Sequence, residues 1–321
     1  MSIGTRDIPY TPEGAQKAGD LLGLDKYAGA LARFVLTCDT PMTVGIQGEW
    51  GSGKTSLINM VAHKLKEHAD HQRTTPNKRE AIASTFRFEA WRHGTVNSDL
   101  LGFVLLRQLV GAITREFQGS PGTIDKIRNL AGTVGGLIGR VVRAAAASAT
   151  NNVSLGLLDG GTLVGGGDGG TGDPPPPAFD ELRDKFENLA KTVATENQEK
   201  RLGGGEREPG RCVVFVDDLD RVLPEQAVSL LEIIKNFADV NHCVFVVACD
   251  YEVVRLGVKE KFGITDDEKV RAFFEKIIQV PFRMPVESYQ INNLLSEFLK
   301  GRLPCLGPIG RLPELVATAT G

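Results

Sequence analysis

The residues with the clearest chemical signature form one glycine-rich segment in the first fifth of the chain. The segment consists of Gly48, Glu49, Trp50, Gly51, Ser52, Gly53, Lys54, Thr55 and Ser56. Its first eight residues fit the phosphate-binding P-loop pattern of glycine, four residues, and then glycine-lysine-serine/threonine. Glycines let the backbone turn tightly and point consecutive N–H groups at phosphate oxygens. The segment is therefore predicted to bind the phosphates of a nucleoside triphosphate.

Two side chains of this segment add chemistry of their own. Lys54 is expected to reach the β- and γ-phosphates, and the Thr55 hydroxyl is expected to hold Mg²⁺. Residues 42–46 are largely apolar, as in a short strand, and residues 56–65 have the periodicity of a helix. A chance match in a chain with 37 glycines would seldom also lie between a strand and a helix. The flanking elements therefore support a functional P-loop.

A pair of acidic residues follows a second apolar stretch. Residues 212–216 are continuously apolar, which predicts a strand buried on both faces, and Asp217 and Asp218 come directly after it. In phosphoryl transfer one carboxylate binds Mg²⁺, and an adjacent carboxylate polarises the attacking water. We assign Asp217 to the metal and Asp218 to the water. The alternative is a pair of aspartates that only cap the end of the strand.

Four other residues have weaker signals. Asp250 follows the next apolar strand, where it can sense the γ-phosphate or cap the following helix. Arg221 can pair with Asp220 or reach a phosphate bound by a neighbouring molecule. Leu24 and Tyr27 precede the P-loop strand, where they can cover the nucleotide base or belong to the core.

Strands and helices alternate through both halves of the chain, which predicts an α/β fold with a parallel sheet flanked by helices. Strands are predicted at residues 42–46, 83–91, 212–216, 242–249 and 279–283. Helices are predicted at residues 26–36, 56–65, 99–117, 179–201, 224–237, 251–262, 266–278 and 287–299. Asp25 and Ser98 are expected to cap two of these helices, and the polar residues 68–79 are expected to form a loop.

The middle of the chain has a different composition. Residues 124–148 are rich in glycine and alanine, and Arg140 and Arg143 interrupt their most apolar part. Charges at the centre of a membrane span are costly, so a surface helix or a partner-binding hairpin is favoured over membrane insertion there. Residues 151–177 include GGGDGG and four consecutive prolines. That composition cannot form a core and predicts a linker or disorder.

The overall composition limits the class of protein. The net charge is −3, and no basic stripe interleaved with aromatic residues is visible, so no nucleic-acid partner is predicted. The five cysteines lack CxxC spacing. Cys212, Cys243 and Cys249 lie in or beside predicted buried strands and are expected to be core residues in a reducing cytosol. No apolar signal segment is visible in residues 1–9, and we expect a cytoplasmic protein.

Several segments together resemble the KAP family of P-loop NTPases. They are GIQGEWGSGKTSL, FEAWRH, VVFVDDLDRVLPEQAVSLLEIIKNF, VFVVACDYEVV and EKIIQVPFRMP, and the resemblance covers nearly the whole chain outside residues 119–208. It implies the additional-strand (ASCE) class of ATPases, in which another strand separates the acidic strand from the P-loop strand. It also implies ATP as the nucleotide.

The resemblance carries further expectations. Family members often have an insertion between the two halves, frequently with membrane helices. They occur in bacterial phage-defence systems and in animal membrane-associated signalling scaffolds. Members usually continue into a helical region with an asparagine-proline-arginine element that can contact nucleotide. Here the sequence ends at Gly321 after a loose stretch at residues 304–313, so we expect either a fragment or another group in that role.

The predicted organisation has four parts. They are an N-terminal helical segment (1–40), the first half of the NTPase core (41–118), an insertion with a linker (119–208), and the second half of the core (209–321). The leading hypothesis is a Mg²⁺-dependent ATPase that couples nucleotide state to the assembly or regulation of a partner, as a homo-oligomer or with a partner protein. The alternative is a nucleotide-gated signalling scaffold with little turnover.

Overall fold

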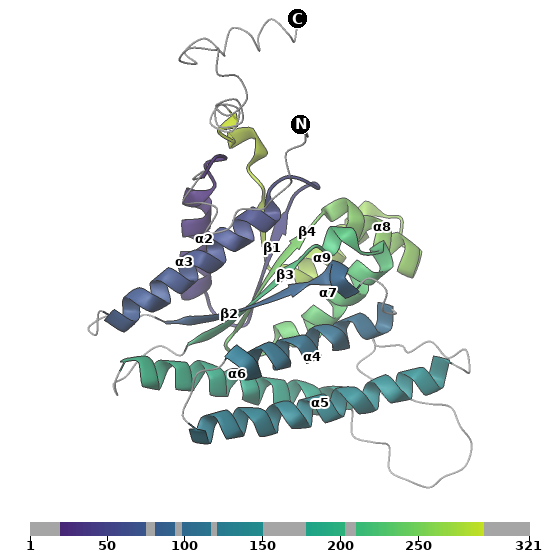
Figure 1. The fold of residues 1–321 in the computed structure, drawn as a ribbon. Helices are drawn as coiled ribbons and strands as arrows, with labels where there is room; N and C mark the ends of the chain where they lie inside the picture. The colour runs from purple at the N-terminus through teal and green to yellow at the C-terminus, as the bar shows by residue number, and fades with distance from the viewer. Residues whose placement is uncertain are drawn as a thin grey trace, which may run out of the picture.

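A five-stranded parallel sheet forms the centre of the computed structural model (Figure 1). The structure describes residues 20–74, 81–93, 98–116, 121–149, 178–202 and 210–291. The strands are β1 (Met42–Gln47), β2 (Ala83–Glu89), β3 (Arg211–Asp217), β4 (Cys243–Cys249) and β5 (Val280–Arg283). All five predicted strands are confirmed. β2 is shorter than predicted because a 3-10 turn, η1 (Ala90–His93), begins where the strand ends.

The strand order is β2-β3-β4-β1-β5. β4 pairs with β1 on one side, with Met42 opposite Val244, and with β3 on the other, with Cys212 opposite Cys243. A strand therefore separates the P-loop strand from the acidic strand, which confirms the additional-strand arrangement. Because all pairings are parallel, β1 and β3 end at the same edge of the sheet, where ligands of such sheets bind.

The neighbouring strands β3 and β4 are buried on both faces of the sheet, as their continuous apolar sequence predicts. Val213 and Phe215 of β3 belong to the core on one side of the sheet, and Val214 and Val216 belong to the core on the other. The cysteines of these strands are buried with free thiols, as is the cysteine that follows the first helix. The expectation that Cys212, Cys243 and Cys249 are core residues is confirmed.

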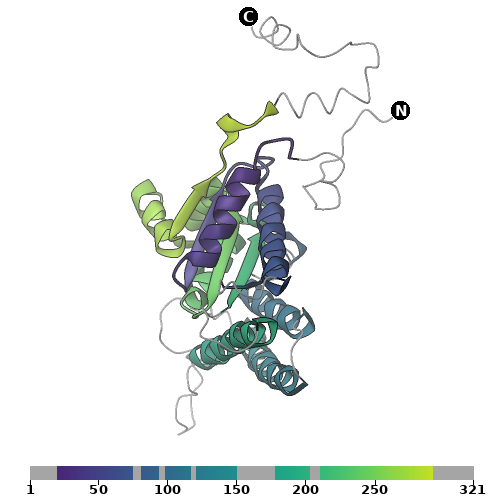
Figure 2. The ribbon, with the colours of Figure 1, turned by 90° about the vertical axis from the view of Figure 1, so that its left-hand side faces the viewer.

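Helices cover both faces of the sheet, as predicted (Figures 1 and 2). One core cluster joins the sheet to α2 (Asp25–Thr37) and α3 (Lys54–Thr74). The other joins it to α4 (Ser98–Glu116), α5 (Pro121–Ala149), α6 (Ala178–Leu202), α7 (Pro224–Ala238), α8 (Tyr251–Phe262) and α9 (Asp267–Ile277).

The helices of the predicted insertion are part of the folded unit. α5 lies beside α4 and α6 beneath the sheet (Figure 1). It buries Ile127, Val134, Leu137 and Ile138 against them. Among the residues that the structure describes, no helix has the length and apolar character needed to cross a membrane. The packing of α5 on α4 and α6 agrees with the surface-helix interpretation. The predicted linker at 151–177 lies outside the described residues.

Three local predictions need correction. Asp25 does not cap α2; it lies in the first turn, Leu24 is the N-cap, and the Asp25 N–H donates to the Asp20 carboxylate at 2.7 Å. Ser98 is the first residue of α4 rather than a residue ahead of it. The loop predicted at residues 68–79 begins too early, because α3 continues to Thr74. Ala69 is buried on one face of this extension.

The last predicted helix, residues 287–299, differs as well. The structure places a 3-10 turn, η3 (Val286–Ser288), at its start, directly after β5 and Pro285. The rest of that prediction, from residue 292 onward, lies outside the described residues.

Candidate nucleotide-binding site

The P-loop lies between β1 and α3, as predicted, and its glycines are needed for its shape. Gly51 and Gly53 have φ of 80° and 85°, a backbone conformation that side chains disfavour. A Cβ on Gly48 would come within 2.5 Å of the Ser52 Oγ. Ser52 is itself buried, and its hydroxyl has no hydrogen-bond partner within the described residues. A tight loop that ends at a helix N-terminus is well suited to bind phosphate.

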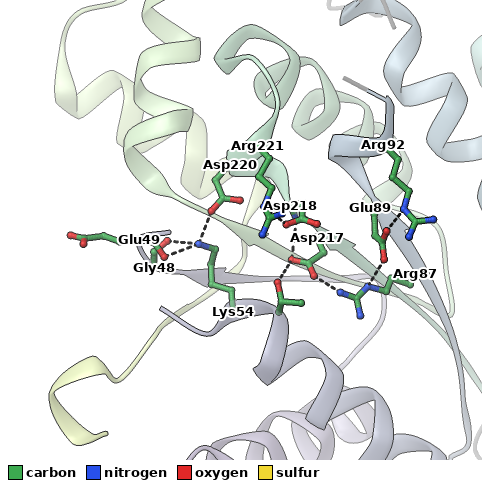
Figure 3. Close-up of polar contacts among 11 residues, drawn as sticks. Gly48, Glu49, Lys54, Arg87, Glu89, Arg92, Asp217, Asp218, Asp220 and Arg221 are labelled. Carbon is green, nitrogen blue, oxygen red and sulfur yellow. Dashed lines mark hydrogen bonds and ion pairs between the residues drawn. The ribbon is translucent and has the colours of Figure 1, made fainter. Parts of the chain in front are cut away.

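Lys54 is held by the protein through three contacts (Figure 3). Its Nζ donates to the carbonyl oxygens of Gly48 at 2.8 Å and Glu49 at 2.9 Å. The third contact is an ion pair with the Asp220 Oδ2 at 2.8 Å, and each of the two side chains is 6% exposed. Three acceptors match the three N–H donors of an ammonium group. The lysine is thus positioned before any phosphate arrives.

The Asp220 contact could not be predicted from sequence. Three aspartates lie at the end of the acidic strand or just after it, and the turn η2 (Leu219–Arg221) determines which of them faces the lysine. The sequence signal for this contact is the close spacing of the three carboxylates, which shows that several acidic side chains lie near the end of β3.

Thr55 and Asp217 meet at the edge of the sheet, as predicted for a magnesium site. The Thr55 Oγ1 lies 3.3 Å from the Asp217 Oδ1, and the Asp218 N–H donates to the same oxygen at 2.9 Å. Asp217 is only 1% exposed. A hydroxyl and a carboxylate are hard oxygen ligands, and Mg²⁺ needs few such ligands because it keeps several waters. The two side chains therefore fit this ion.

Asp218 has an unusual backbone and a perturbed carboxyl. Its φ of 59° lies in the left-handed region, which non-glycine residues seldom adopt. Burial and the neighbouring Asp217 carboxylate raise the pKa of the Asp218 carboxyl, and Arg221 opposes this shift. The Arg221 Nε lies 2.9 Å from the Asp218 Oδ1. Arg221 therefore pairs with Asp218 and not with Asp220, which corrects the sequence-based expectation.

Strand β2 contributes residues that sequence reasoning did not assign. Glu89 lies opposite Asp217 in the parallel register, at the edge of the sheet. The Arg87 Nη2 lies 2.5 Å from the Asp217 Oδ2, and Arg92 pairs with Glu89. Arg87 and Glu89 are two residues apart on a strand, so they share one face. The two-residue spacing of Arg87 and Glu89 on a predicted strand is the sequence signal that could have pointed to these residues.

Each of four carboxylates at this edge therefore has a basic partner (Figure 3). The pairs are Asp217 with Arg87, Asp218 with Arg221, Asp220 with Lys54, and Glu89 with Arg92. The formal charges of these eight side chains balance.

The weaker candidates are placed as follows. Leu24 is 1% exposed and packs in the core beside the P-loop, and the Tyr27 ring meets Phe282 edge to face at 6.1 Å. Asp250 caps α8, because its side chain accepts from the Glu252 N–H at 2.9 Å. These contacts match the structural alternatives for all three residues. Contacts of Leu24 and Tyr27 with the base, and of Asp250 with the γ-phosphate, remain predictions.

Tyr289, to which the sequence analysis gave no role, also contacts the P-loop. The Tyr289 hydroxyl donates to the Ser52 carbonyl oxygen at 2.5 Å, across 237 residues of chain. The Gln290 N–H donates to the Leu22 carbonyl at 3.1 Å. The segment after β5 is thereby tied both to the P-loop and to the residues ahead of α2.

The sheet order, the P-loop and the acidic strand end define a P-loop NTPase of the additional-strand class. The family model for the KAP family P-loop domain matches residues 24–301, and the chain belongs to this family.

Similarity to individual proteins is more distant. The Phage T7 exclusion protein of Escherichia coli (strain K12) is 22% identical over 289 residues, which cover 85% of this chain and 34% of that protein. The Kinase D-interacting substrate of 220 kDa from Rattus norvegicus and from Homo sapiens is 39% identical over 56 residues, which cover 17% of this chain and 3% of each relative. The chain thus spans about a third of the length of the first relative.

Among solved structures, the Aeropyrum pernix ORC1 protein in complex with DNA has a TM-score of 0.39 and 14% identity, over 83% of this chain and 46% of that chain.

Proposed function

We propose that this chain binds Mg²⁺-ATP, hydrolyses it, and uses the nucleotide state to control the assembly or activity of a partner. The observation that carries the proposal is the contact between Thr55 and Asp217, 162 residues apart in sequence, beside Lys54 and Asp218. These side chains are the ones that phosphoryl transfer requires, at the edge of the sheet where ligands bind.

In this proposal each residue has a defined task. Lys54 exchanges protein acceptors for oxygens of the β- and γ-phosphates. Thr55 and Asp217 hold Mg²⁺, which supplies charge neutralisation when it is bound. The Asp218 carboxylate accepts a proton from the attacking water, and its raised pKa makes it a stronger base than an ordinary aspartate. Arg221 engages the Asp218 Oδ1, so we assign the Oδ2 to the water.

The biological setting is part of the same proposal. The name of the Escherichia coli relative supports a role in bacterial phage defence. Free buried cysteines support a reducing, cytoplasmic location. The partner is a second copy of this chain or another protein of a multi-component system.

A second function is supported by one observation. The Arg221 ion pair lowers the proton affinity of Asp218 and so opposes its use as a base. A nucleotide-gated signalling scaffold with little turnover would retain such a pair in the bound state.

Two variants test the proposal and separate the two functions. Lys54→Ala should abolish ATP binding in calorimetry, because it removes the charge that faces the phosphates. Asp218→Asn should bind Mg²⁺-ATP as the wild type does but lose at least about 10²-fold in phosphate release, since an amide cannot accept the proton. Equal ATP affinity of Lys54→Ala and the wild type would overturn the P-loop assignment. Equal, very low phosphate release by Asp218→Asn and the wild type would favour the scaffold.

A further inference from the structure

The two oxygens of the Asp217 carboxylate have separate partners. The Oδ1 faces the Thr55 hydroxyl at 3.3 Å and accepts from the Asp218 N–H at 2.9 Å. The Oδ2 faces the guanidinium of Arg87 at 2.5 Å. One oxygen is therefore directed toward the proposed metal ligand Thr55, and the other is engaged by a basic side chain from a neighbouring strand.

Arg87 reaches this carboxylate diagonally across the sheet. It lies opposite Phe215 in the β2–β3 register, two residues before the Glu89–Asp217 pair. Its guanidinium also contacts the Asn59 side chain of α3, and its Nε lies 3.7 Å from a Glu89 oxygen. A planar guanidinium with several partners has a defined orientation, unlike a lysine in the same place. Arg87 thus links β2, β3 and the P-loop helix.

We propose that Arg87 is a positioning residue that orients Asp217 for magnesium. By engaging the Oδ2, it leaves the Oδ1 directed toward Thr55, so that one hydroxyl and one carboxylate oxygen are presented together. This inference rests on the proposed function, because it requires Asp217 to be a magnesium ligand. Groups that hydrogen-bond to metal-ligating carboxylates commonly change metal affinity by about 10- to 100-fold when they are removed.

Arg87 also carries a positive charge near the metal position, and this charge acts in the opposite direction. Coulomb repulsion would weaken the binding of a cation, so removing only the charge would strengthen it. Asp217 is almost completely buried, whereas the Arg87 side chain is 33% exposed and therefore screened by water. When Arg87 is removed, we therefore expect the Mg²⁺ affinity to fall, because the lost orientation of Asp217 weakens binding more than the lost repulsion strengthens it.

The test measures the magnesium dependence of nucleotide binding and does not use turnover. Binding of the fluorescent analogue mant-ATP to the full chain is titrated with Mg²⁺ and, separately, in EDTA. Arg87→Gln should raise the Mg²⁺ midpoint about tenfold and leave the affinity in EDTA unchanged. Arg87→Lys should give a smaller shift, because one N–H can still engage the Oδ2. In an Asp217→Asn background, Arg87→Gln should add no further shift.

Arg211→Gln is the matched control. Arg211 begins β3 at the opposite edge of the sheet and donates to the backbone carbonyls of Cys38 and Val35. Its loss should destabilise the protein in thermal unfolding without moving the Mg²⁺ midpoint.

Three outcomes would overturn the positioning role of Arg87. They are an unchanged midpoint in Arg87→Gln, a lower midpoint, and an equal loss of affinity in EDTA and in Mg²⁺. If instead the wild type itself binds mant-ATP with no dependence on Mg²⁺, the metal assignment of the proposed function is wrong, and the inference about Arg87 is wrong with it.

Discussion

Lys54 and Asp220 form an ion pair of 2.8 Å in which both side chains are almost entirely buried. The lysine expected to face the phosphates is therefore already paired with a carboxylate of the same site. A triphosphate must compete with that carboxylate for the ammonium group. We therefore expect Asp220 to weaken the binding of a triphosphate to Lys54.

Asp220→Asn should bind ATP about tenfold more tightly than the wild type, because it removes an anion that competes with, and repels, the phosphates. Isothermal titration calorimetry measures the change. Asp266→Asn is a matched control, since Asp266 caps α9 through the Glu268 N–H at 2.9 Å and does not contact the P-loop residues. Weaker ATP binding by Asp220→Asn would show that Asp220 chiefly positions the lysine.

The pH dependence of turnover should report the ionisation of Asp218. Only the carboxylate form can accept a proton, and burial together with Asp217 raises the pKa of this carboxyl above its ordinary value of 3.8. Hydrolysis should therefore rise with pH through a midpoint above that value. Arg221 lowers the same pKa, so Arg221→Gln should move the acid limb of the rate profile to higher pH.

The matched control for this profile is Arg255→Gln. Arg255 is exposed on α8 and pairs with Glu252 at 2.8 Å. An acid limb that stays in place in Arg221→Gln, or moves to lower pH, would mean that another group limits the rate at low pH.

Local sequence patterns were enough to predict the P-loop, the five strands and the meeting of Thr55 with Asp217, whose role as magnesium ligands stays a prediction. Each of these predictions follows from the residue types in a short stretch of sequence. A parallel strand buried on both faces is apolar, and ligands of such sheets bind at the carboxyl ends of the strands. The family resemblance implied that another strand separates the P-loop strand from the acidic strand, and the strand pairing confirms this and identifies that strand as β4.

The contacts that the sequence did not predict depend on tertiary structure. Asp220 reaches Lys54 because of the turn η2, and Arg87 reaches Asp217 because of the register between β2 and β3. The spacing of the acidic residues and of Arg87 and Glu89 indicates charged residues near this edge, but it does not identify which pairs form. The displaced cap of α2 has a different cause, since the Asp20 side chain accepts the N–H of Asp25 and the helix begins there without a side-chain cap from its own N-cap.

The packing of α5 predicts how its apolar residues respond to truncation. Leu137 is 1% exposed in the core that α5 shares with α4 and α6. Leu137→Ala should lower the free energy of unfolding by about 2–5 kcal/mol, through lost apolar burial and the cavity left behind. Lys126→Ala, at an exposed position of the same helix, should change it by less than about 0.5 kcal/mol. Urea denaturation compares the two, and equal stability of both variants would show that α5 packs less tightly than the structure indicates.

Turnover per molecule should rise with protein concentration. Charge that develops on the γ-phosphate is commonly neutralised by an arginine, often supplied by a neighbouring molecule. In the described part of this site Arg87, Arg92 and Arg221 are each engaged by a carboxylate. A second copy or a partner that supplies an arginine would complete the site without breaking these pairs. Phosphate release measured across a wide dilution series, beside sizing by light scattering, tests this. Fast, concentration-independent turnover by a monomer would contradict the prediction and would direct attention to Arg221 or Arg283 acting within one chain.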